Sequence, residues 1–114
     1  MDRRARGQQI EQLAAAYLQQ QGLLIKQSNY HTRQGEIDLI ATEPGVIVFV
    51  EVRYRKHSAY GSGAESVTAA KQQKLRLAAM KYLQQHQLDN ADCRFDVISA
   101  SGDPVQFEWI RNAF

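Results

Sequence analysis

Cysteine is almost absent from this sequence, since Cys93 is the only one among 114 residues. A single cysteine cannot form a disulfide within the chain, which favours a reducing compartment. No uninterrupted apolar stretch approaches the length that spans a bilayer, and the first residues, MDRRARGQQ, lack the apolar run of a secretory signal. We therefore expect a cytoplasmic protein with no membrane partner, in which Cys93 is a small buried hydrophobic residue.

Proline and glycine are also scarce, with two and seven residues, and no stretch is rich enough in them to act as a linker. The sequence shows no internal repeat. Its composition, 44% apolar and 23% charged, is ordinary for a globular protein. A chain of this length holds one apolar core and is too short for two, so we predict a single domain over residues 1–114.

Several kinds of site are excluded by spacing. The three histidines and the cysteine are too scattered along the chain for a zinc signature. Gly61-Ser62-Gly63 lacks the following lysine and the spacing of a phosphate-binding loop. No Ser/His/Asp or Cys/His arrangement stands out for nucleophilic catalysis.

Net charge is small, at +2, but the basic residues are unevenly distributed. The segment 53–81 contains seven basic residues and only one acid, Glu65. The basic residues are Arg53, Arg55, Lys56, Lys71, Lys74, Arg76 and Lys81. Folding could concentrate this positive charge on one side of the molecule, as a nucleic-acid-binding surface requires. A solvated helix face is the alternative, and for the helical lysines alone it is the simpler interpretation.

Hydrophobic periodicity predicts two helices and five strands in the order α-β-β-β-α-β-β. Apolar residues recur at helical spacing in both predicted helices: Ile10, Leu13, Ala14, Tyr17 and Leu18 in the first, and Leu75, Ala78, Ala79, Tyr82 and Leu83 in the second. The predicted helices cover residues 3–21 and 66–86, and the predicted strands cover 23–30, 36–41, 46–54, 93–100 and 105–110. We expect an α/β fold with a mixed sheet and helices packed against it.

The second and third predicted strands should pair as a hairpin around the turn Thr42-Glu43-Pro44-Gly45. A four-residue loop would place Glu36 opposite Glu51 and Asp38 opposite Phe49. Opposite side chains share a face, so Glu36, Asp38, Glu51 and Arg53 would lie on one side of the ladder. The other side would carry Ile37, Leu39, Val48, Val50 and Val52.

A cluster of carboxylates in a sheet is unfavourable, because like charges repel and each one costs free energy to desolvate. A divalent cation removes this objection, since Mg²⁺ binds carboxylate oxygens together with water and phosphate. These acids therefore suggest a metal site. The alternative places Glu36 and Asp38 at a solvated strand end, with Glu51 paired to Arg53 or Arg55.

The segments Gly35-Glu36-Ile37-Asp38-Leu39-Ile40-Ala41 and Val48-Phe49-Val50-Glu51-Val52-Arg53-Tyr54-Arg55 resemble the GEIDLIA and FVEVK-type motifs of the bacterial YraN family. The resemblance continues through residues 70–75 and 94–98, and thus covers nearly the whole chain. That family in turn resembles PD-(D/E)XK nucleases, especially archaeal-type Holliday junction resolvases. The resemblance implies a restriction-endonuclease-like core that uses Mg²⁺ or Mn²⁺ and acts on DNA.

The resemblance also implies roles for individual residues. Asp38 and Glu51 would be the two motif acids and metal ligands, with Glu36 or Glu11 assisting. Arg53 occupies the position of the motif lysine, and Gln72 that of a supporting residue on the second helix. For Glu11 an exposed helix acid is an equal alternative, and for Gln72 ordinary helix surface is the simpler one.

The basic residues expected to contact nucleic acid are Arg55, Lys56, Lys71 and Lys74. Val105, Phe107 and Trp109 alternate as core residues do, although a homodimer contact is the other possibility, since junction resolvases generally work as dimers. Arg94 and Asp96 share a strand face and should form an ion pair.

Arginine at position 53 departs from the nuclease pattern. Its guanidinium can clamp a phosphate in a bidentate fork, but it stays charged and cannot act as a base. The expected function is therefore a Mg²⁺-dependent endonuclease-like protein acting on branched or structured DNA. The alternative is a catalytically weak or inactive nucleic-acid-binding module on the same scaffold.

Overall fold

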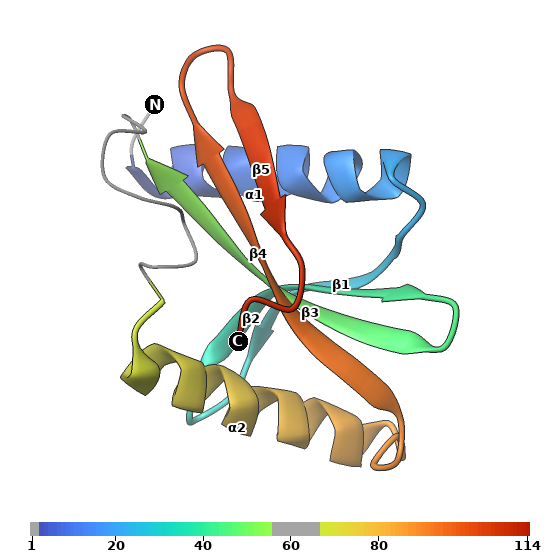
Figure 1. The fold of residues 1–114 in the computed structure, drawn as a ribbon. Coiled ribbons are helices and arrows are strands. Elements are labelled where there is room, and N and C mark those ends of the chain that lie inside the picture. Colours follow the sequence, from blue (N-terminus) through green and yellow to red (C-terminus); the bar gives the residue numbers. More distant parts are fainter. Residues whose placement is uncertain (1–2, 56–66) are drawn as a thin grey trace.

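The computed structural model describes residues 3–55 and 67–114, which form two helices and five strands (Figure 1). The elements are α1 (Arg3–Gln20), β1 (Leu24–His31), β2 (Glu36–Glu43), β3 (Val46–Arg55), α2 (Ala69–Gln85), β4 (Asp92–Ser101) and β5 (Gln106–Ile110). This is the predicted order, and it confirms the mixed α/β fold. The predicted element boundaries are correct to within three residues at every end.

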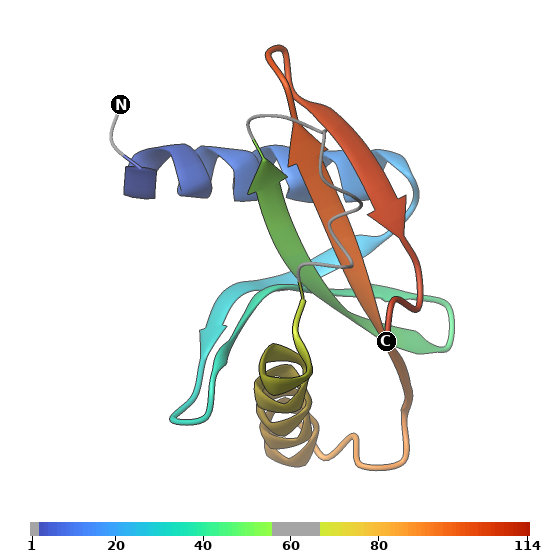
Figure 2. The ribbon, with the colours of Figure 1, turned by 60° about the vertical axis from the view of Figure 1, so that its left-hand side comes forward.

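The five strands form one sheet in the order β1-β2-β3-β4-β5, so β3 is the central strand. Neighbouring strands are antiparallel except for β3 and β4, which are parallel. Parallel neighbours need a crossover connection, and α2 lies within it. The two views together show α1 and α2 on opposite faces of the twisted sheet (Figures 1 and 2).

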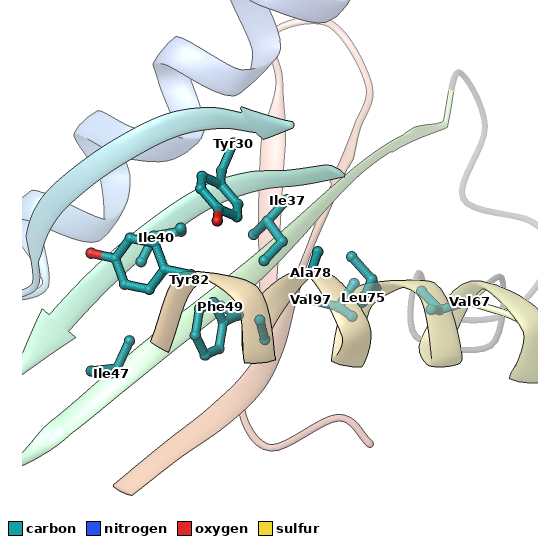
Figure 3. Close-up of a cluster of buried hydrophobic side chains, with 11 residues drawn as sticks. Tyr30, Ile37, Ile40, Ile47, Phe49, Val67, Leu75, Ala78, Tyr82 and Val97 are labelled. Atoms are coloured by element: carbon teal, nitrogen blue, oxygen red, sulfur yellow. The ribbon is translucent and has the colours of Figure 1, made fainter. Parts of the chain in front are cut away.

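Each helix covers its own hydrophobic cluster. On the α1 face, Ala14 and Leu18 pack with Leu39, Val48 and Val50. On the α2 face, the cluster is larger and draws residues from β1, β2, β3 and β4 onto the helix (Figure 3). Its members include Tyr30, Ile37, Ile40, Phe49, Leu75, Ala78, Tyr82 and Val97.

Tyr82 is the aromatic centre of the α2 cluster. Its ring meets those of Tyr30 and Phe49 edge to face, with centroids 5.4 and 5.9 Å apart (Figure 3). Edge-to-face contacts of this kind add to the stabilisation that burial alone supplies. They hold α2 against β1 and β3.

The start of α2 is held by a local cap and a close approach. The Thr68 side chain accepts a hydrogen bond from the Lys71 backbone N–H, which satisfies one free donor of the first turn. Gly35, in the β1–β2 connection, lies against Lys74, because a Cβ at position 35 would come within 3.1 Å of the Lys74 Cβ. A larger residue at position 35 would require the turn or the helix to shift by a few tenths of an ångström.

The β2–β3 hairpin corrects the predicted register by two residues. Glu43 pairs with Val46, so the loop contains only Pro44 and Gly45, and Gly45 takes the positive φ of 79° that the tight turn requires. The predicted pairs Glu36–Glu51 and Asp38–Phe49 are therefore wrong. A shift of two residues does not by itself move a side chain to the other face, because alternation along a strand has a period of two.

Besides a bulge between Ile25 and Gln27 in β1, alternation reverses in β1 and in β2 at residues that the register places opposite each other. Ser28 pairs with Leu39, on the α1 side, whereas Tyr30 and Ile37 pair and belong to the α2 cluster. Regular alternation would put both pairs on the same face. The prediction that Ile37 shares a face with Leu39 is therefore wrong, and the reversal occurs at Asn29 and Asp38.

β4 and the C-terminal segment are joined by a buried carboxylate. Asp96, with no exposed surface, accepts hydrogen bonds from Arg94 Nε, Trp109 Nε1 and the Asn112 backbone N–H. The predicted Arg94–Asp96 ion pair is confirmed, and Arg94 also binds Glu43 on β2. This carboxylate is fully satisfied, so it has a structural role.

Two further expectations about burial are wrong. Cys93 is exposed, because Val97 and Ile98, farther along β4, enter the clusters while residues 92 and 93 lie at its solvated start. Leu13 is 42% exposed, since it lies at the edge of the α1 apolar stripe. Phe107 and Trp109 are half-buried and pack on Tyr17 of α1, which supports their reading as core residues.

Neither helix in the described part of the chain is long and apolar enough to cross a membrane.

Truncating the α2 side chain that faces the sheet should cost far more stability than truncating its exposed neighbour. Leu75→Ala should lower the free energy of unfolding by about 2–5 kcal/mol, because it leaves a cavity in the cluster under α2. The matched change Leu77→Ala, at an exposed position of the same helix, should cost about 1 kcal/mol or less. Urea denaturation of both variants measures the difference, and equal losses would contradict the packing of α2.

Candidate functional site

Asp38 lies where the β2–β3 ladder stops. The last pair is Leu39 with Val50, and the same register places Asp38 opposite Glu51. At this point the Asp38 Oδ2 atom accepts a hydrogen bond of 2.9 Å from the Val52 backbone N–H. The carboxylate thus takes the place of a main-chain acceptor and is fixed beside the central strand.

Glu51 lies in the middle of β3 and is only 6% exposed. Its Oε1 atom is 3.6 Å from Arg53 Nε and 4.0 Å from Lys71 Nζ, which are ion-pair distances too long for good hydrogen bonds. The Oε2 atom of Glu51 is buried without a hydrogen-bond partner, and so is Arg53 Nε. A buried carboxylate oxygen without a partner is rare in folded proteins, because leaving it unsatisfied costs free energy.

Glu11 reaches the same place from α1. Its carboxyl group lies close to Asp38 and Asn29, which shift its pKa up and down respectively. The site therefore contains one acid from each of three elements: Glu11 from α1, Asp38 from β2 and Glu51 from β3. α1 can approach Asp38 because the alternation of β2 reverses there.

Burial raises the pKa of all three acids, and Asp38 raises the pKa of the other two further. Burial, followed by the charge of Asp38, raises the pKa of Glu11 to about 7. Burial, again followed by Asp38, raises the pKa of Glu51 to about 7, against the opposing charges of Lys71 and Arg53. Burial also raises the pKa of Asp38, although the Val52 N–H and the Glu11 carboxyl oppose this. Near neutral pH the cluster holds protons that ordinary carboxylates would have lost.

Two cations stand beside these acids. Lys71 in the first turn of α2 faces Glu51 and stabilises the charged form of Asp38. Arg53, two residues after Glu51 on the same strand, keeps about a third of its side chain exposed. The structure therefore supplies a lysine at the site, from the helix and not from the strand position that Arg53 occupies.

The other predicted site residues lie farther out or have other partners. Glu36 is half-exposed and forms an ion pair of 2.7 Å with His31, so it stands at the rim. The side-chain amide of Gln72 donates to the Val67 carbonyl, at the start of α2. Lys74 is exposed on α2. The Arg55 side chain and the whole of Lys56 lie outside the described residues.

Solvent reaches the cluster beside α1. An open groove of about 410 Å³ is lined by Arg4, Gly7, Gln8, Glu11, Asn29, His31 and Glu36. An adjoining groove along α1 shares Gln8, Glu11 and Asn29 with it. Glu11 is thus the member of the cluster that lines both grooves, and it connects them to Asp38.

Metal binding has to be judged on the donors present. Within residues 3–55 and 67–114, no three or more His, Cys, Asp and Glu side chains are placed to hold a metal ion by themselves. Mg²⁺ is usually bound by only one or two carboxylates, with water and substrate phosphate completing its ligands. The unpartnered Glu51 Oε2 atom and the neighbouring Asp38 carboxylate provide such a pair.

Sequence reasoning missed one residue of this site and gave another a different role. Asn29 had no expected function, although asparagine tolerates the left-handed backbone conformation that it adopts here. Lys71 was expected to contact nucleic acid, and the structure places its ammonium beside Glu51. Helical spacing alone could not show which lysine of α2 faces β3.

Residues 10–100 match the model of a family described as "Uncharacterised protein family UPF0102". A UPF0102 protein of Aeromonas hydrophila is 50% identical over 112 residues, which cover 96% of this chain and 85% of that protein. One of Nitrosomonas europaea is 50% identical over 96% of this chain and 92% of its own length. One of Pectobacterium carotovorum is 47% identical over all of this chain and 97% of its own.

Glu51 should make the stability of the metal-free protein fall as pH rises. Its folded-state pKa of about 7 exceeds the ordinary 4.5, so the folded protein binds this proton more tightly than the unfolded chain does. Its contribution is complete below the unfolded pKa and is lost as pH rises through the folded one. We expect a loss of about 1–3 kcal/mol between about pH 5 and pH 8.

Urea denaturation in the presence of a chelator measures this loss across the pH range. Glu51→Gln should flatten the dependence, whereas Glu108→Gln, at an exposed position of β5, should leave it in place. Stability that rises over this range in the wild-type protein would contradict the buried, repelling arrangement.

Proposed function

We propose that this chain, which belongs to the UPF0102 family, is a Mg²⁺-dependent endonuclease-like protein that acts on branched or otherwise structured DNA. The observation that carries the proposal is the meeting of Asp38 and Glu51 on neighbouring strands, with one Glu51 oxygen buried and unpartnered. Burial and repulsion make this arrangement costly in the absence of a cation. An arrangement of charged groups that destabilises the fold is a candidate for a functional site.

Asp38 and Glu51 would hold the cation, and Glu11 would assist from α1, since its carboxyl group contacts Asp38. Mn²⁺ accepts the same oxygen donors and could replace Mg²⁺. When bound, a divalent cation supplies positive charge for a phosphate under attack and acidifies water. Glu36 stands at the groove rim and shapes its entrance together with His31.

The two basic side chains of the site, Arg53 and Lys71, would have different roles. Arg53 stays charged at every relevant pH, and its donors suit a phosphate oxygen. Lys71 balances the charge of Glu51, and its ammonium group can also release a proton, which arginine cannot do. Lys71 could therefore supply the proton transfer that the motif lysine of the nucleases can carry out and that Arg53 cannot.

The DNA backbone would approach along the start of α2 and the end of β3. Lys71 and Lys74 lie on the first two turns of α2, and Arg55 ends β3. We propose that Lys71 and Lys74 contact the DNA backbone, together with Lys56 and the Arg55 side chain, which lie outside the described residues. Basic side chains of this kind contribute affinity that does not depend on sequence, which fits recognition of DNA by its shape.

The alternative function is a binding module on the same scaffold that does not cut DNA. Arg53 favours it, because the nuclease pattern carries a lysine there. Such a module would bind branched DNA tightly and in a salt-dependent manner, with no strand scission in Mg²⁺ or Mn²⁺.

Asp38→Asn and Glu51→Gln should each lower cleavage of a labelled four-way DNA junction by at least about a hundredfold. Both changes remove a ligand charge, and both relieve repulsion, so the metal-free variants should be as stable as the wild-type protein or more so. Electrophoresis of the junction after incubation with Mg²⁺ or Mn²⁺ measures cleavage, and a gel-shift assay in chelator measures binding. Glu108→Gln serves as the control that removes an acid elsewhere.

The same assay separates the two functions. Binding without cleavage by the wild-type protein would reject the nuclease and support the binding module. Cleavage that survives in both Asp38→Asn and Glu51→Gln would reject the assignment of these residues.

Lys71 and Lys74 form a matched pair, because they lie three residues apart on α2 and only Lys71 faces Glu51. Lys74→Gln should weaken DNA binding and lower its salt dependence by about one charge. Lys71→Gln should in addition lower the single-turnover cleavage rate of fully bound junction by at least about tenfold. Equal single-turnover rates in the two variants would remove Lys71 from the reaction.

A further inference from the structure

Asn29 adopts an unusual backbone conformation for a residue inside a strand. Its φ is +54°, in the left-handed region, although β1 continues on both sides of it. Residues other than glycine rarely occupy this region, and asparagine is among the few that tolerate it. Such strain often persists where a site requires a particular side-chain direction.

The position of Asn29 in the sheet connects this conformation to the acidic cluster. The flanking pairs, Ser28 with Leu39 and Tyr30 with Ile37, place Asn29 opposite Asp38. Both strands exchange faces at this row, since Ser28 and Leu39 lie on the α1 side and Tyr30 and Ile37 on the α2 side. The left-handed residue is what reverses β1, and Asp38 lies at the reversal of β2.

The side chain of Asn29 points toward α1. It lines both grooves beside that helix, as Glu11 does. Asn29 is also the neighbour that lowers the pKa of Glu11, against burial and the charges of Asp38 and Glu36, which raise it. Asn29 is thus the neutral neighbour that stabilises Glu11 as an anion.

We propose that Asn29 is a positioning residue of the acidic site, whose left-handed backbone aims its amide at Glu11 and holds that carboxylate toward Asp38 as a cation-binding group. This inference rests on the proposed function and extends it, because it assigns Glu11 to the site through a residue outside the sequence motifs. Glycine at position 29 would keep the backbone conformation but lose the donor. Most other side chains would keep neither.

Asn29→Gly is therefore the variant that separates the amide from the backbone. Titration with Mn²⁺ alone, followed by the loss of the free Mn²⁺ electron paramagnetic resonance signal, measures cation affinity. We expect Asn29→Gly to bind Mn²⁺ about tenfold or more weakly than the wild-type protein, because a group that orients a ligand is worth that much. Its thermal stability should stay close to that of the wild-type protein, since glycine relieves the strained φ.

The control is Gln87→Gly, which changes another non-glycine residue with positive φ, 57°, in the exposed turn after α2. It relieves a similar strain away from the acids and should leave Mn²⁺ affinity unchanged. Wild-type affinity in Asn29→Gly, or an equal loss in Gln87→Gly, would overturn the inference.

A double-mutant cycle of Asn29→Gly and Glu11→Ala in chelator tests the contact without any cation. The unfolding constants should show a coupling of at least about threefold, and purely additive effects would overturn the positioning role. Asp38→Asn should abolish Mn²⁺ binding in the first assay. Failure of the wild-type protein to bind Mn²⁺ would count against the proposed function, whereas the cycle would still decide whether Asn29 holds Glu11.

Discussion

Electrostatic repulsion among three acids, of which Glu51 is buried and Glu11 and Asp38 are partly buried, is the constraint on which the rest of the structure depends. Burial and the charge of Asp38 raise the pKa of both Glu11 and Glu51, and burial raises the pKa of Asp38 itself. The fold tolerates this because the surrounding clusters supply the stability, and because Lys71 and Arg53 offset part of the charge. A domain built only for stability would place apolar residues there.

The architecture explains how acids from distant parts of the sequence meet. β3 is the central strand, so Glu51 is buried by its neighbours, and α1 and α2 cover opposite faces of the sheet. Groups from the two helices can approach one point only if the sheet exchanges faces there. The reversal at Asn29 and Asp38 does this, so that Glu11 from the α1 side and Lys71 from the α2 side both act on Asp38. The buried Asp96 network is the structural contrast, because every oxygen there has a donor.

Much of the site could be predicted from local patterns. The alternation of residues 36–41 and 46–54 placed Asp38 and Glu51 on one face, and this survived an error of two residues in register because the period of a strand is two. The turn around Pro44 was too short for a four-residue loop, which strand propensity alone does not reveal. Ile37 and Asn29 could not be placed, since a reversal of alternation depends on one φ angle that the pattern of apolar residues does not encode.

The sequence by itself determined the order of elements, the two apolar helix stripes and the acids carried by the central hairpin, because these follow from periodicity within short segments. Only the tertiary structure decided that Glu11 faces Asp38, that Lys71 rather than Lys74 faces Glu51, and that Asn29 belongs to the site. Those contacts join α1, β1, β2, β3 and α2 through the packing of helices on a twisted sheet. Helical spacing does not show which way the polar side chains of a helix point. That direction is fixed only when each helix buries its apolar face against the sheet.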